Sequence, residues 1–159
     1  MTEKQKLVEQ LRGGVKGIGL GYSHRDLSNT DLRGVNLDFF IFIRADLTGA
    51  DLTGASLNHA DLLGAGLVKA TLIGTSFSGA CLAQAHLTRA NLTNAALPFA
   101  KLLEADLTGA ILSGADLTDA DLTRANLSGA ILNGANLTDA NLTDTNLTGA
   151  DLTGVIGLE

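Results

Sequence analysis

Residues 45–64 have the sequence ADLTGADLTGASLNHADLLG, which is four successive five-residue units with leucine at the centre of each. The spacing continues without a slip from Leu27 to Leu152, so that every fifth residue over 26 units is Leu or Phe. Phe42 and Phe77 are the two exceptions to leucine, and Ala usually stands two residues before the centre. Such a regular repeat predicts a structure made by stacking one small unit many times.

A period of five matches neither an α-helix, which repeats every 3.6 residues, nor a strand, which repeats every two. The chain must therefore turn once in each unit. In Ala45-Asp46-Leu47 the Ala and Leu side chains point to the same side of an extended segment and Asp46 points to the other. Thr48 and Gly49 then form a corner. Short extended sides joined by corners predict a solenoid with a continuous apolar core.

The repeat Ala-(Asp/Asn)-Leu-Xaa-Xaa, present as ADLTG, ANLTN, ADLTD and ANLSG, resembles that of the pentapeptide-repeat proteins. The resemblance covers residues 25–154 and implies an all-β fold, a right-handed quadrilateral parallel β-helix with four units per coil. The units would then form about 6.5 coils and a tower about 31 Å tall at the usual strand spacing. We expect an N-terminal helix and cap over residues 1–24, the β-helix over 25–154 and a C-terminal tail over 155–159.

The first residues break the repeat and predict a short helix that covers the N-terminal end of the solenoid. Thr2-Glu3-Lys4-Gln5 has the pattern of a capping box, and Gly13-Gly14 would end the helix. A lid is expected because an open β edge recruits other chains. The apolar residues of this segment are Leu7, Val8 and Leu11 on one side of the helix, and Val15, Ile18 and Leu20, which we expect to cross the end of the core.

At the C-terminal end only Val155, Ile156 and Leu158 follow the last unit. Three apolar residues are too few for a second helical lid. The last coil is therefore expected to be thinly covered or covered by another subunit.

The corner residues divide the four faces into two pairs. On the faces of Leu27 and Leu32 the second corner residue is mostly Gly or Asn, which predicts type II turns with positive φ. On the other two faces a different turn is expected, with negative φ at Asp119 and Asp144. The corners in that second group are Phe39, His59, Phe99, Asp119, Arg44, Glu104 and Asp144.

The sequence has no pattern that predicts catalysis, a cofactor or a metal site. His24, His59, His86 and Cys81 fall on different parts of the predicted surface, and no phosphate-binding loop is present. Asp and Asn are frequent just before the central Leu, which indicates hydrogen bonds to nearby backbone. A lone cysteine predicts no disulfide, and without a signal peptide or membrane span the expected location is cytoplasmic.

One face of the predicted solenoid carries outward apolar side chains in successive coils. They stack at strand spacing beside two phenylalanines on the adjoining corner, as expected of an interface for a protein partner. The alternative is that these side chains merely pack on one another or under a lid segment. The residues are Ile41, Ile43, Leu63, Ala83 and Leu103, with Phe39 and Phe99 at the corner.

Charge is unevenly distributed along the chain. Residues 1–44 contain seven Lys/Arg and five Asp/Glu, whereas residues 105–159 contain one and eight. Over the height of the C-terminal section this is one net negative charge per about 2 Å, near the value of about 1.7 Å for duplex DNA. Basic clusters are missing, which argues against direct nucleic-acid binding. The candidate acidic edge consists of Asp116, Asp119, Asp121, Asp139 and Asp144.

The sequence therefore predicts a non-catalytic, cytoplasmic protein-interaction or regulatory solenoid whose partner is unidentified. A homodimer through the C-terminal end or the apolar face is a further expectation. The resemblance implies one alternative, because the family includes quinolone-resistance members that protect gyrase by imitating DNA. The uninterrupted repeat and the short tail differ from the loops and the C-terminal dimerisation helix of those members.

Overall fold

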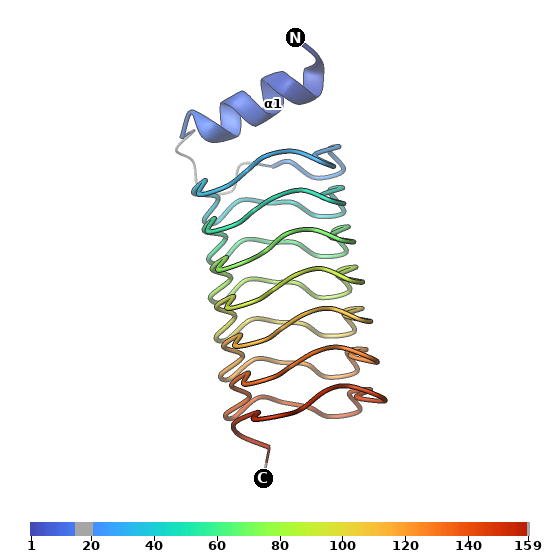
Figure 1. Ribbon diagram of the computed structural model, residues 1–159. Helices are drawn as coiled ribbons and strands as arrows, with labels where there is room; N and C mark the ends of the chain where they lie inside the picture. The colour runs from blue at the N-terminus through green and yellow to red at the C-terminus, as the bar shows by residue number, and fades with distance from the viewer. Residues whose placement is uncertain (15–20, 159) are drawn as a thin grey trace.

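The computed structural model describes residues 1–14 and 21–158 and is a tower of stacked coils with one helix across its N-terminal end (Figure 1). Helix α1 spans Glu3–Arg12. Every bridge in the described part is parallel and joins residues 20 apart, from Gly21 with Ile41 to Asn136 with Ile156. Each coil therefore has four five-residue sides, and each side pairs through a single bridging residue. The expected right-handed quadrilateral parallel β-helix is confirmed.

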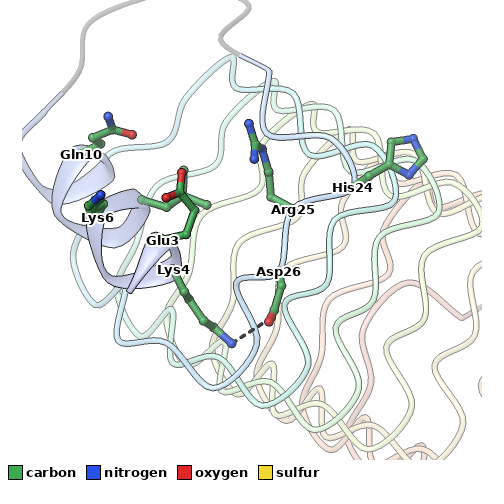
Figure 2. Close-up of a pocket in the computed structure, with 8 residues that line it drawn as sticks. Glu3, Lys4, Lys6, Gln10, His24, Arg25 and Asp26 are labelled. Atoms are coloured by element: carbon green, nitrogen blue, oxygen red, sulfur yellow. Dashed lines mark hydrogen bonds and ion pairs between the residues drawn. The ribbon is translucent and has the colours of Figure 1, made fainter. Parts of the chain in front are cut away.

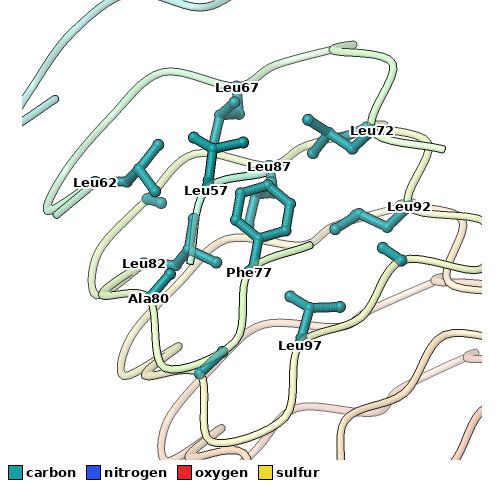
Figure 3. Close-up of a cluster of buried hydrophobic side chains, with 14 of the residues drawn as sticks. Leu57, Leu62, Leu67, Leu72, Phe77, Ala80, Leu82, Leu87, Leu92 and Leu97 are labelled. Carbon is teal, nitrogen blue, oxygen red and sulfur yellow. The ribbon is translucent and has the colours of Figure 1, made fainter. Parts of the chain in front are cut away.

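Leucine and alanine fill the inside of the tower because their side chains point to the same side of each short extended segment. The central Leu residues of the middle coils are fully buried, and Phe77 takes the place of one of them among Leu57, Leu72 and Leu97 (Figure 3). Each buried Leu contributes about 2 kcal/mol. The hydroxyl of buried Thr75, in an alanine position, donates to the Leu52 carbonyl at 2.7 Å, so its polar group is satisfied.

Backbone hydrogen bonds join each coil to the next. On one side, Leu47 N donates to Gly66 O at 2.7 Å, Gly49 N to Val68 O at 2.9 Å, and Gly66 N to Ala45 O at 2.9 Å. The same three bonds recur on other sides of the stack. A coil thus depends on its neighbours for both its backbone partners and its core, as in other solenoids.

The carboxylates and amides before the central Leu have a structural role, as predicted. Asp46 Oδ1 accepts the backbone N–H of Thr48 at 2.9 Å, and Asp106 Oδ1 accepts both the N–H and the hydroxyl of Thr108, at 3.0 and 2.6 Å. This contact two residues along the chain is an Asx turn, which supports the backbone where it enters each corner.

The corners have one geometry, so the prediction of two turn types is wrong. The second corner residue has positive φ on all four sides, including Asp119 (55°) and Asp144 (58°). Asp119 N donates to Thr138 O in the next coil at 3.0 Å, and Ala120 N closes the corner on Leu117 O at 3.0 Å. Because both bonds must stay in register, every corner takes the same turn. The others that were predicted to differ also have positive φ: Phe39, Arg44, His59, Phe99 and Glu104.

Some corner glycines make room for a neighbouring side chain. A Cβ on Gly114 would lie 2.5 Å from Asn94 Oδ1, and a Cβ on Gly79 would lie 2.7 Å from His59 Nδ1. Arg44 lies over Gly64 in the same way, with its Cγ 3.3 Å from the Cβ position. The side chain of one coil therefore lies over the glycine of the next. Gly134 has open space around its Cβ position.

Helix α1 begins and ends as predicted and covers the N-terminal coil. Thr2 caps it, with Gln5 N donating to Thr2 Oγ1 at 3.1 Å and Thr2 N donating to Gln5 Oε1 at 2.7 Å. Gly13 is the C-cap, and Leu11 is buried at the end of the core. Leu7 and Val8 pack there as well. Val15, Ile18 and Leu20, which were expected to cross the core, lie outside the described residues.

The C-terminal end is less well covered. Leu142, Leu147 and Leu152 in the last coil are only half-buried, and Ile156 and Leu158 are exposed. The thin cover expected from the three apolar residues of the tail is therefore present in the described chain.

Candidate protein-interaction surface

An aliphatic stripe runs along the face of the tower whose inward residues include Phe42, Leu62, Leu82 and Leu102. We define it as Ile43, Leu63, Ala83 and Leu103, which occupy the same position in four successive coils. Neighbours are separated by about 4.8 Å, the spacing between paired strands. Leu63 is 37% exposed and Leu103 is 36% exposed, while Ile43 and Ala83 are half-buried. The stripe is a continuous strip of accessible apolar surface.

Aromatic side chains border the stripe at one corner. Phe39 is 46% exposed and Phe99 is 61% exposed, values that are unusual for phenylalanine. The Phe39 ring stacks on the imidazole of His59 in the next coil, with centroids 5.1 Å apart and planes inclined by 18°. His59 in turn leans over Gly79. Sequence reasoning predicted the two phenylalanines but missed His59, although its place in the same five-residue register indicates the position.

Polar side chains border the stripe at the opposite corner. Gln84 Nε2 donates to Glu104 Oε2 at 3.1 Å, and Arg124 Nη1 pairs with Glu104 Oε1 at 2.9 Å. The Arg44 side chain lies over Gly64, two coils before Gln84, and forms no hydrogen bond or ion pair within the described residues, although its backbone N–H donates to Leu63 O at 2.9 Å. A polar rim beside an apolar centre is the usual composition of a protein interface.

A second column on this face consists of Ile41, Asp61, Cys81 and Lys101. Ile41 and Cys81 are half-buried, and Lys101 is exposed. Asp61 and Lys101 form no ion pair within the described residues. Ile41 is the one member of this column that was predicted to lie at the interface, and the register places Asp61, Cys81 and Lys101 on the same face.

Four of the five residues of the acidic edge gather at one corner, and Asp144 lies apart from them. Asp119 and Asp139 occupy the same corner in successive coils, with Asp116 and Asp121 on the two sides of that corner, while Asp144 lies at the next corner. Asp116 and Asp121 accept the N–H and hydroxyl of Thr118 and Thr123, so they support turns. The remaining three accept no hydrogen bond within the described residues.

A cavity of about 560 Å³ lies between helix α1 and the first coil (Figure 2). Lys4 Nζ donates to Asp26 Oδ1 at 2.8 Å across its edge, and Lys6 and Arg25 also line it. The hydrogen bond from Lys4 and those from Ser28 hold the pKa of Asp26 well below its usual range. The cavity is part of the contact between lid and tower.

Within the described ranges, no group of three His, Cys, Asp or Glu side chains is arranged to hold a metal ion. The one helix of the described chain is too short and too polar to cross a membrane.

Comparison with known families finds a match to the model of pentapeptide repeats, in eight copies. The matched segments are 26–64, 50–89, 85–124 and 120–156. No curated protein matches the chain.

Solved structures with this fold include QnrB1, a plasmid-mediated fluoroquinolone resistance protein, with a TM-score of 0.57, 18% identity, and coverage of 86% of this chain and 90% of that one. A pentapeptide repeat protein from the Arabidopsis thaliana thylakoid lumen is 36% identical over 69% of this chain and 71% of its own, with a TM-score of 0.37. HetL from the cyanobacterium Nostoc sp. strain PCC 7120, a protein involved in heterocyst differentiation regulation, is 27% identical, with coverage of 96% and 91% and a TM-score of 0.32.

Proposed function

The chain belongs to the pentapeptide-repeat family, and we propose that it is a non-catalytic protein-interaction module that binds its partner through the aliphatic stripe. The observation that carries the proposal is the exposure of Leu63 and Leu103 on a face bordered by aromatic side chains at one corner and polar ones at the other. Exposed apolar side chains that are contiguous rather than scattered mark interaction sites.

A non-catalytic role is supported by how the polar side chains are used. The carboxylates before the central Leu are occupied by turn hydrogen bonds, as Asp106 and Asp121 are. A general acid or base needs a carboxyl group that is free to exchange its proton with a substrate. The rigidity of the stack favours presentation of a fixed surface instead.

The test is affinity capture from an extract of the source cells with the wild type and with Leu63→Glu and Leu103→Glu. Both substitutions place a charge at the stripe while leaving the core residues Leu62 and Leu102 untouched, so capture should be lost and the thermal melt unchanged. Ile73→Glu is the matched control, since Ile73 is also 36% exposed at the same position of a unit on another face. Equal capture by all four proteins would contradict the proposal.

A second candidate function is modulation of a topoisomerase by DNA mimicry, as the family resemblance implies. It is favoured by the charge of residues 105–159, which have eight Asp/Glu and one Arg. The likeness to QnrB1 supports it at the level of the fold alone. The position of Asp144 at a separate corner and the use of Asp116 and Asp121 in turns make it the weaker candidate.

The DNA-mimic candidate is tested with a gyrase supercoiling assay at low salt. A mimic should inhibit or protect the enzyme, and its effect should weaken steeply with ionic strength. Asp119→Asn, Asp139→Asn and Asp144→Asn should remove the effect without unfolding the protein, since these three hold no turn. If gyrase supercoiling activity is unchanged by a large excess of the wild type and of the triple variant, gyrase is excluded as the target.

A further inference from the structure

We propose that the protein bound at the aliphatic stripe is a second copy of this chain, docked face to face with its tower running in the opposite direction. The inference rests on the proposed function, because it takes the stripe to be a protein-binding surface. We call the segment that one coil contributes to this face a rung. The twofold axis is parallel to the strands and passes between the rungs of Leu62 and Leu82, at the centre of the four-residue stripe. Four observations favour this partner and this orientation.

The first observation is the order of large and small side chains along the stripe. About that axis, Ile43 lies opposite Leu103 of the second copy, and Leu63 lies opposite Ala83 of the second copy. A large side chain thus faces a small one at the two central rungs, which lets the sheets approach. Each of the four residues of the stripe is therefore covered by a stripe residue of the second copy. In a parallel dimer, by contrast, each rung faces the same rung of the second copy. The stripe then lies opposite the column of Ile41 and Asp61 of the second copy instead of opposite the second stripe.

The second observation concerns the aromatic corner. The same axis places Phe39 opposite Phe99 of the second copy and His59 opposite Gly79 of the second copy. Phe39 and Phe99 are the most exposed aromatic rings among the described residues, and each would gain an aromatic neighbour. His59, which leans over Gly79 of its own chain, faces the one position of this corner column, among Phe39, His59, Gly79 and Phe99, that has no side chain.

The third observation is charge complementarity at the polar corner. Arg44 lies opposite Glu104 of the second copy, and by symmetry the contact occurs twice. Arg44 has no ionic partner among the described residues of its own chain, and Glu104 already holds Arg124 at 2.9 Å. Addition of the second guanidinium completes a network in which the carboxylate lies between two cations. Arg–carboxylate pairs of this kind direct the register of an interface.

The fourth observation is the charge gradient along the tower. Residues 1–44 have a net charge of +2 and residues 105–159 a net charge of −7. An antiparallel dimer brings the basic section of each copy beside the acidic section of the other. A parallel dimer brings the two acidic sections together, which costs free energy at ordinary ionic strength.

The test is reciprocal charge reversal, measured by sedimentation equilibrium with the folded full-length protein. Arg44→Glu places two carboxylates opposite each other across the interface, and Glu104→Arg places two guanidinium groups there. Each variant should therefore weaken dimerisation by at least about tenfold. The double variant Arg44→Glu/Glu104→Arg should dimerise more strongly than either single variant, because the contact between the copies is restored with its charges exchanged, whereas the contact of residue 104 with Arg124 is not restored. Arg89→Glu is the matched control, because Arg89 also lies over a corner glycine, Gly109, but on another face. It should leave the dimer unchanged.

The position of the interface is tested independently with the single cysteine. Cys81 lies on this face, and in the proposed dimer it is displaced by one rung from the Cys81 of the second copy, across packed sheets about 10 Å apart. Bismaleimidoethane should therefore link the two chains through these thiols. A dimer through the C-terminal end keeps the two thiols tens of ångströms apart and gives no crosslink. Crosslinked dimer together with recovery in the double variant supports the inference.

Three results overturn the inference: a wild type that stays monomeric at high concentration, a dimer that does not crosslink at Cys81, or a folded double variant that stays monomeric. The proposed function is tested by a different outcome, the capture of another protein. If the chain is monomeric while Leu63→Glu still abolishes capture of another protein, the inference of self-association fails and the interaction module stands. If the stripe variants change neither capture nor oligomeric state, both fail.

Discussion

At the scale of single residues, corner glycines meet two needs, and the structure separates them. Gly114 and Gly134 occupy equivalent corners with the same φ of 66°, a conformation that L side chains rarely adopt. Only Gly114 is covered, because Asn94 Oδ1 lies 2.5 Å from the position of its missing Cβ. Both glycines are therefore needed for positive φ, and Gly114 is also needed because a side chain there would clash with Asn94.

Gly114→Ala should lower the free energy of unfolding more than Gly134→Ala does. Gly134→Ala adds only the strain of positive φ, about 1 kcal/mol, whereas Gly114→Ala adds a clash with Asn94 as well. Asn94→Gly in the background of Gly114→Ala should bring the loss back close to the Gly134→Ala value, because it removes the covering side chain and glycine tolerates the φ of 55° at residue 94. Denaturant titration measures all three, and equal losses for the two single variants would show that Asn94 moves aside at no cost.

Burial alternates between neighbouring residues of a unit, so two adjacent truncations should differ sharply. Leu107→Ala leaves a cavity in the core and should cost about 2 to 5 kcal/mol. Thr108→Ala removes two partly buried hydroxyl hydrogen bonds, one donated to Asp106 Oδ1 and one accepted from Asn126 Nδ2, and should cost about 1 to 2 kcal/mol. The comparison is made by urea unfolding. Similar losses at both positions would be incompatible with the inward placement of the central leucines.

At the scale of elements, the contact between helix α1 and the first coil combines apolar packing and ion pairs. Leu11 is buried on the end of the core, while Lys4 pairs with Asp26 at 2.8 Å and Arg12 with Asp31 at 2.7 Å. Exposed ion pairs contribute little on their own. Their value here is positional, since they fix the direction of a helix held mainly by Leu7, Val8 and Leu11.

Docking of α1 should weaken as pH falls. The folded-state pKa of Asp26 is depressed chiefly by the hydrogen bond from Lys4, so its contribution is present above the unfolded pKa of about 4 and is lost as pH decreases below it. Hydrogen exchange of the α1 amides, corrected for intrinsic rates, should therefore accelerate progressively as pH falls below about 5.

Two variants make the acid effect specific. Asp26→Asn should reduce the pH dependence, because the titrating partner of Lys4 is removed. Asp31→Asn should reduce it less, since the pKa of Asp31 is lowered chiefly by Arg33 of its own unit and only secondarily by Arg12 of α1. An unchanged pH dependence in Asp26→Asn would show that the Lys4 contact does not hold the helix.

Periodicity predicts the elements of this protein better than it predicts the details at their corners. The five-residue spacing predicted stacked coils with Ala and Leu inside, the family resemblance implied four units per coil, and the capping box of Thr2 and Gln5 predicted the lid. The turn at Asp119 was predicted wrongly because residue preferences act locally, whereas the hydrogen bond from Asp119 N to the next coil imposes the turn. The register places Phe39 and His59 at the same corner, but the stacking of their rings follows from side-chain packing that the spacing does not specify.

At the scale of the whole molecule, the two ends of the tower are not equivalent. The N-terminal coil is covered by α1, whereas Leu142, Leu147 and Leu152 in the last coil are only half-buried. In a solenoid each coil is stabilised by its neighbours, so a coil with one neighbour and a thin cover has the lowest local stability.

Native-state hydrogen exchange should therefore show a gradient along the tower. Amides of the central coils, such as Leu82 N and Leu102 N, should exchange only by global unfolding, and Asn141 N and Asn146 N in the last coil should exchange by local fraying. Leu11→Glu should extend fraying to the first coil, because it removes the buried contact of the lid, and should leave the last coil unchanged. Uniform protection from first coil to last would mean that the tower opens as one cooperative unit or that the C-terminal end is covered in solution. Dilution distinguishes these two, since only a cover supplied by another copy is lost as the protein concentration falls.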